Sequence, residues 1–137
     1  MKTTRILAAA ALIVGGGLAM NPALAQQFDA HGIARTETVR HDIGDAAHEA
    51  LQVRVDFAPG AAFPRHTHPG TEIAYVLAGT VEYQFDSQPP VTLKTGAALF
   101  IPAGTVHSAR NVGAGVASEL ATYVVAKGQP IVAVAGQ

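Results

Sequence analysis

Short β-prone runs, which glycine and proline interrupt about every ten residues, dominate the sequence after residue 26. In "LQVRVDF" (51–57) and "TVEYQFD" (80–86), apolar and polar residues alternate, which is the pattern of a strand with one buried face. Asp56 falls on the polar face. "IAYVLA" (73–78) is apolar throughout, which predicts a strand buried on both faces. No convincing helix is found, so these runs predict a single all-β domain, either a sandwich or a barrel.

The first 25 residues have the three-part layout of a secretory signal peptide. A short basic start precedes an apolar run of 15 residues, "ILAAAALIVGGGLAM", and "NPALA" then brings the helix breaker Pro22 and small residues. A membrane anchor is the alternative, but about 20 apolar residues are needed to cross a bilayer. We therefore expect cleavage after Ala25, a mature domain of residues 26–137, and a periplasmic or secreted protein with no membrane span after cleavage.

The composition limits which classes of partner the mature chain is expected to bind. Removing Lys2 and Arg5 leaves seven basic against ten acidic residues, and hence a net charge of −3. Such a mildly acidic domain gives no electrostatic reason to bind nucleic acid or an anionic membrane. The chain has no cysteine, so its core, a metal or a partner chain must hold it together. Residues 33–43 are a candidate edge strand, and because such strands are often covered by a partner, we expect a homodimer.

The stretch "RHTHPGTE" carries the first candidate site. His66 and His68 are two residues apart, so on a strand their side chains point to the same face. The proline–glycine pair that follows bends the chain, which lets Glu72 return to that point from the next strand. Two imidazoles and one carboxylate are the facial-triad ligand set of iron(II) and similar ions. Arg65 lies between positions that face the site, so it should point away from it.

A second cluster, "GAALFIPAGTVHSARN" (96–111), supplies a fourth candidate ligand. Gly104 makes a turn after the "LFIP" strand, and His107 opens the following strand. Neutral imidazole and carboxylate suit first-row divalent metals, and a six-coordinate ion held by four ligands keeps two positions open for water or substrate. Asn111 is expected to hydrogen-bond a turn.

The two clusters resemble both signature motifs of the cupin superfamily at every defining position. These positions are Gly60, His66, His68, Glu72 and Gly79 in the first motif and Gly96, Pro102, Gly104, His107 and Asn111 in the second. The resemblance is to small single-domain bacterial cupins, often labelled quercetin-dioxygenase-like. It implies a single-domain jelly roll, or double-stranded β-helix barrel, with its core at about residues 51–125. It also implies one divalent metal ion, iron, manganese, nickel or zinc, with the ligands His66, His68, Glu72 and His107.

Other histidines and aromatic residues are interpreted as structural. Solvated surface positions are expected for the histidines outside both motifs, His31, His41 and His48. Core positions are expected for four aromatic residues, Phe63, Tyr83, Phe85 and Phe100. A buried phenol usually needs a hydrogen-bond partner, so Tyr83 should have one.

Two classes of function follow from the predicted metal site. The first is an exported mononuclear metalloenzyme, dioxygenase-like or isomerase-like, that acts on a small oxygen-rich molecule. The second is a non-catalytic protein that binds a small ligand or a metal. No residue beyond the four ligands stands out as a general base, so the sequence assigns no catalytic residue. A wet cavity that reaches the metal favours catalysis, whereas a sealed apolar pocket favours a structural metal.

Overall fold

The computed structural model describes residues 27–44 and 47–135, in which every regular element is a β-strand. The ten strands of this part are β1 (Ile33–Asp42), β2 (His48–Phe57), β3 (Ala62–Thr67), β4 (Thr71–Ala78), β5 (Thr80–Phe85), β6 (Val91–Lys94), β7 (Ala98–Ile101), β8 (His107–Asn111), β9 (Ala117–Ala126) and β10 (Ala133–Val134). The predicted signal peptide lies outside the described residues. Within those residues there is no helix that is long and apolar enough to cross a membrane.

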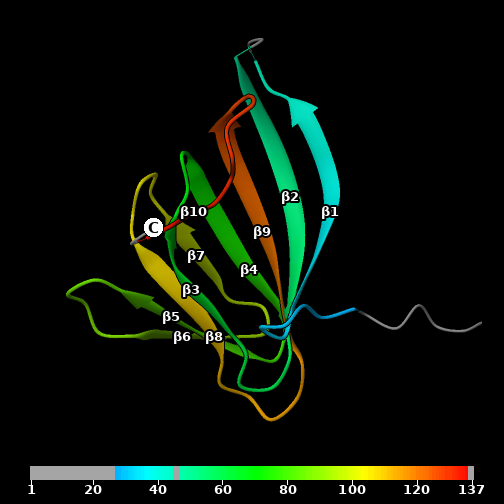
Figure 1. Ribbon diagram of the computed structural model, residues 1–137, viewed down its shortest axis with the longest axis vertical. Helices are drawn as coiled ribbons and strands as arrows, with labels where there is room; N and C mark the ends of the chain where they lie inside the picture. The colour runs from blue at the N-terminus through cyan, green and yellow to red at the C-terminus, as the bar shows by residue number, and fades with distance from the viewer. Residues whose placement is uncertain (1–26, 45–46, 136–137) are drawn as a thin grey trace, which may run out of the picture.

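The strands form two five-stranded antiparallel sheets, whose arrangement can be followed in Figure 1. One sheet has the order β1-β2-β9-β4-β7 and the other has the order β10-β3-β8-β5-β6. Chain neighbours such as β3 and β4, or β4 and β5, belong to different sheets. The chain therefore winds around the core instead of running along one sheet. This arrangement is a jelly roll, which confirms the predicted fold class.

Alternation along the strands sends one set of side chains into the core between the sheets. The buried set on β2 and β5 is the one that the alternation predicted, namely Leu51, Val53, Val55, Phe57, Val81, Tyr83 and Phe85. Full burial of one aliphatic or aromatic side chain of this kind contributes roughly 1.5–3 kcal/mol. In a chain without cysteine, this core is what holds the two sheets together.

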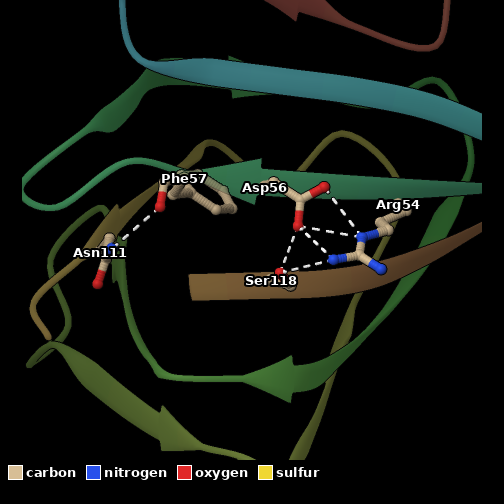
Figure 2. Close-up of polar contacts among 5 residues, drawn as sticks. All are labelled: Arg54, Asp56, Phe57, Asn111 and Ser118. Carbon is tan, nitrogen blue, oxygen red and sulfur yellow. Dashed lines mark hydrogen bonds and ion pairs between the residues drawn. The ribbon is translucent and has the colours of Figure 1, made fainter. Parts of the chain in front are cut away.

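Asp56 lies on the same face of β2 as Arg54, as the alternation predicted, but its side chain is fully buried, which a polar face did not lead us to expect. Its cross-strand neighbours are Ala34 on β1 and Ser118 on β9. Arg54 donates two hydrogen bonds of 2.9 Å to the carboxylate, and the Ser118 hydroxyl donates a further one (Figure 2). A carboxylate paired in this way tolerates burial. Alternation gives the face on which a residue lies, but not the partners that cover it.

The strand β4 was predicted to be buried on both faces, and this is wrong. Its outward side chains Ile73, Tyr75 and Leu77 are 46%, 43% and 37% exposed. Phe100, predicted as a core residue, is 61% exposed and is the cross-strand partner of Ile73. Within residues 27–44 and 47–135 no third layer covers this side of the sheet. We call Ile73, Tyr75, Leu77, Phe100 and Val124 the outer apolar face.

The strand β1 is an edge strand, as predicted. Among the described strands it pairs with β2 alone, and its last eight residues are exposed. Its first residues, Ile33 and Ala34, are buried and anchor it to the core. The exposed part leaves one row of backbone groups available for pairing.

Asn111, at the end of β8, hydrogen-bonds a turn, as predicted. Its Nδ2 atom lies within hydrogen-bond distance of three carbonyl oxygens, those of Phe57, Ala58 and Gly115. Its Oδ1 atom accepts a hydrogen bond from the Gly113 N–H at 2.9 Å. Figure 2 shows the contact with Phe57. One buried amide thus satisfies backbone groups at the end of β2 and in the turn between β8 and β9.

The bend between β3 and β4 depends on Gly70, because a Cβ there would overlap the backbone carbonyl of Val124 on β9. We predict that Gly70→Ala lowers the free energy of unfolding by about 1–3 kcal/mol, measured by chemical denaturation. Gly115→Ala is the matched control, because no other atom lies within 4 Å of a Cβ at that position. Its effect should stay within about 0.5 kcal/mol. Equal losses in the two variants would contradict this account of the bend.

Candidate metal centre

The four ligands expected from the sequence come from both sheets and meet in the core. His66 on β3 and His107 on β8 are direct cross-strand partners. His68 follows β3 in the turn, and Glu72 is the second residue of β4 in the other sheet. All four side chains are buried, with at most 5% exposure. The two sheets therefore close on a group of three imidazoles and one carboxylate.

The donor atoms of this group lie close to one another. One ring nitrogen from each of the three histidines lies within 4.8 Å of those of the other two. Glu72 Oε2 lies 2.9 Å from His68 Nε2 and 3.4 Å from His107 Nε2. Three imidazoles and one carboxylate around a common point are a donor set for first-row divalent metals.

Backbone carbonyl groups orient all three imidazoles. The Nδ1 partners are the carbonyl oxygens of Pro64 for His66 (2.7 Å), Thr105 for His107 (2.9 Å) and Ile131 for His68. A carbonyl oxygen only accepts hydrogen bonds, so each neutral ring carries its proton on Nδ1 and presents a lone pair on Nε2. Hydrogen bonds of this kind set the tautomer and raise the basicity of histidines that bind metals.

Two buried atoms of this group have no hydrogen-bond partner, His68 Nε2 and Glu72 Oε2. They lie 2.9 Å apart, but with the ring proton on Nδ1 the His68 Nε2 lone pair faces a carboxylate oxygen, and neither atom then has a proton to donate. Leaving a buried polar atom unsatisfied costs about 1–3 kcal/mol. A cation at this point would satisfy both atoms, so the residues present fit a divalent metal ion.

The electrostatics favour protonation states that can bind a metal. Burial raises the pKa of Glu72, but hydrogen bonds and positive charge from the His107 and His68 rings, when these are protonated, outweigh it and lower the pKa of Glu72 to about 2. Burial, helped by the nearby charge of His107, lowers the pKa of His66 to about 4. Burial also disfavours the charged form of His107, yet the Glu72 carboxylate raises the pKa of His107 overall. At neutral pH, Glu72 is therefore ionised and His66 is neutral.

A small pocket reaches these ligands from the surface. His66, Glu72 and His107 line it, and so do Arg35, Phe63, Tyr83 and Glu119. The free room at its centre is about that of one water molecule. Arg35 is exposed, whereas the other lining residues are buried or, in the case of Phe63, half-buried. The pocket therefore meets solvent on the side of Arg35 and is not sealed by apolar side chains.

Glu119 is a candidate functional residue that sequence reasoning missed. It is buried on β9, and the Tyr83 hydroxyl donates a hydrogen bond to its carboxyl group. Burial and the negative charge of Glu72 raise the pKa of Glu119 to about 8, so the group is largely protonated at neutral pH. The available signal was alternation, because Glu119 shares the inward face of β9 with Ala121 and Tyr123. Tyr83 thus has the partner that its burial predicted.

The three histidines outside the motifs and Arg65, which the sequence assigned away from the site, lie away from it. His31, His41 and His48 are exposed. Arg65 pairs with Asp86 at the surface and is not among the residues that line the pocket. Phe85 is a core residue, as predicted, whereas Phe63 is half-buried and lines the pocket. Sequence alternation therefore separated most outward side chains from inward ones, but did not say which inward ones border a pocket.

Comparison with known proteins identifies a matching family model and relatives that each cover about half of the chain. A family model for the cupin domain matches residues 53–125, which are 73 of the 137 residues. Germin-like protein subfamily 2 member 2 of Arabidopsis thaliana is 40% identical over 75 residues, covering 51% of this chain and 34% of that protein. Dimethylsulfoniopropionate lyase DddQ of Ruegeria pomeroyi is 37% identical over 68 residues, covering 49% and 34%. The match spans about a third of the length of these curated relatives.

Solved structures share the same architecture. A recombinant oxalate oxidase in complex with glycolate matches with a TM-score of 0.62 and 26% identity, covering 77% of this chain and 56% of that chain. The two facing sheets, the two sequence motifs and the family match over more than half of the residues agree with one another. The chain belongs to the cupin family.

Proposed function

We propose that this cupin is a mononuclear metalloenzyme with the metal ligands His66, His68, Glu72 and His107. The observation that carries the proposal is the pair of buried atoms without hydrogen-bond partners, His68 Nε2 and Glu72 Oε2, at the point where the imidazoles converge. Iron, manganese, nickel or zinc suits such donors. When bound, the ion supplies Lewis-acid chemistry and, for the redox-active metals, electron transfer.

The pocket favours catalysis over a purely structural metal. A structural ion is enclosed by protein ligands and needs no approach from solvent. Here a pocket with polar side chains in its wall runs from an exposed arginine to His66, Glu72 and His107. The same wall contains a carboxyl group that holds a proton, Glu119. These features support an enzyme over the alternative of a non-catalytic protein that binds a small ligand or a metal.

The proposed substrate is a small oxygen-rich molecule, and the reaction is dioxygenase-like or isomerase-like. The narrow pocket supports a small substrate. The similar proteins named above act, by their names, on oxalate and on dimethylsulfoniopropionate, both of which are small molecules with oxygen donors. Oxygen atoms of such a substrate would suit a divalent ion held by His66, His68, Glu72 and His107.

Within this enzyme, Glu119 and Tyr83 form the group that holds a proton for the reaction. Glu72 is already ionised and serves as a ligand, so it is not the group that holds a proton, whereas Glu119 in the same pocket can. Glu119 is protonated at neutral pH, and the Tyr83 hydroxyl fixes one of its oxygens. A pKa near the working pH is what proton transfer requires.

We propose in addition that the protein is exported to the periplasm or secreted. The basic start, the apolar run and the small residues before Gln26 support export. Sequencing the N-terminus of the protein recovered from its native compartment should give Gln26 as the first residue. A first residue of Met1 in that material would contradict export by cleavage.

The outer apolar face and the edge strand β1 support a homodimer. Five large apolar side chains are exposed together on one sheet, and such patches often mark an interface. We predict that light scattering gives twice the chain mass and that Phe100→Lys shifts the protein toward the monomer. Lys94→Gln, an exposed substitution on the other sheet, should leave the mass unchanged. A monomeric wild-type protein at micromolar concentration would rule the dimer out.

For the metal ligands, we predict that His66→Ala lowers metal affinity more than about 100-fold, because losing even an outer hydrogen-bond partner of a ligand costs 10–100-fold. Metal content after dialysis, measured by mass spectrometry, checks this. The variant should keep the circular dichroism of the metal-free wild type. His31→Ala, at an exposed position, is the matched control and should bind metal normally. Equal metal content in the two variants would refute the assigned ligand set.

For Glu119, we predict a pH-dependent loss of stability in the metal-free protein. Its pKa is raised from 4.5 to about 8, so over this range the folded state holds a proton that the unfolded state has released. Stability therefore falls as pH rises through the range, by at most about 1.4 kcal/mol per pH unit, and levels off above it. Glu119→Gln cannot release this proton. Between pH 4.5 and about 8, the free energy of unfolding, measured by denaturation, should fall more steeply with pH in the wild type than in Glu119→Gln. Equal slopes in the two proteins would show that Glu119 is not protonated.

A further inference from the structure

Arg35 places a positive charge at the solvent side of the pocket. It lies on β1, opposite Val55 of β2. Its Cζ atom lies 4.6 Å from the centroid of the Phe63 ring, so the guanidinium stacks on that ring. Phe63 in turn packs edge-on against the His66 ring, with 4.6 Å between the centroids. The cation is thus held one aromatic ring away from a proposed metal ligand.

Arg35 also differs from the other arginines in residues 27–44 and 47–135. Four of these have a carboxylate partner within ion-pair distance, namely Arg40, Arg54, Arg65 and Arg110. Arg35 has none among the described residues. The carboxyl group of Glu119 borders the same pocket but is engaged by Tyr83. The planar guanidinium of Arg35 therefore keeps its hydrogen-bond donors available for an anion.

We propose that Arg35 binds a carboxylate of the substrate, whose other end reaches the metal centre. The inference rests on the proposed function and narrows its substrate class to short carboxylates with a second oxygen donor. Arg35 lines the same pocket as His66, Glu72 and His107. Its guanidinium lies within about 9 Å of the His66 ring, on the far side of the Phe63 ring. The free room in this pocket is small, so only a short chain is expected to reach from Arg35 toward the ligands, and arginine pairs with carboxylates through two parallel hydrogen bonds.

The test is calorimetric titration of the metal-loaded protein with three probes, oxalate, malonate and succinate. We predict that Arg35→Gln weakens the binding of at least one probe roughly tenfold, as expected for a charged hydrogen bond near solvent. Arg35→Lys should recover part of the loss, because it keeps the charge but not the planar fork. Arg110→Gln removes an exposed arginine that does not line the pocket and should leave all three affinities unchanged.

The titrations are repeated with metal-free protein, and metal content is measured separately in every sample. Failure of the wild type to bind metal counts against the proposed function alone. The assignment of Arg35 is overturned if the wild type binds none of the probes in either state. It is equally overturned if the wild type and Arg35→Gln bind all three probes with the same affinity in both states. Thermal melts should show that the variants, altered at an exposed position of β1, remain folded.

Discussion

Three hydrogen bonds between imidazole Nδ1 atoms and backbone carbonyls are the constraint on which the proposed metal centre depends. The carbonyls come from β3, from the turn before β8 and from the segment after β9. Each bond turns an Nε2 lone pair toward the same buried point, where Glu72 adds a negative charge. Without a cation these groups face one another in surroundings that screen charge poorly. The folded core holds them there, so the ordering that ligation requires is complete before a metal binds.

Buried polar groups elsewhere in the described residues have hydrogen-bond partners, in contrast to two atoms of the proposed metal centre. Asp56 is paired with Arg54 and Ser118, and Asn111 is bonded to backbone groups on two loops. Within the described residues, the buried side-chain atoms without partners are His68 Nε2 and Glu72 Oε2. Native proteins leave few such atoms, and each one calls for an explanation. Here both belong to one donor group, and a bound cation explains them together.

Sequence spacing was sufficient for the fold class and for bringing His66, His68, Glu72 and His107 to one place, because strand alternation and a bend dictate both. It did not predict the exposed side of β4, since an apolar run reports hydrophobicity but not what covers it. Nor did it predict the hydrogen bond between His68 and the Ile131 carbonyl, or the pairing of β10 with β3. Figure 1 shows how the chain after β9 crosses to reach β3. Both contacts join residues far apart in the sequence. The contacts of Arg35 with Phe63 and of Glu119 with Tyr83 also join the two sheets, so they too could not be predicted from the sequence.

Anomalous diffraction from crystals of the metal-loaded protein tests the central claim most directly. The account predicts one peak in the core, about 2.0–2.2 Å from the Nε2 atoms of His66, His68 and His107 and from a carboxylate oxygen of Glu72. The absorption edge at which the peak appears would identify the metal. A peak held by other residues, or no peak in crystals grown from protein with a full complement of metal in solution, would contradict the proposed centre.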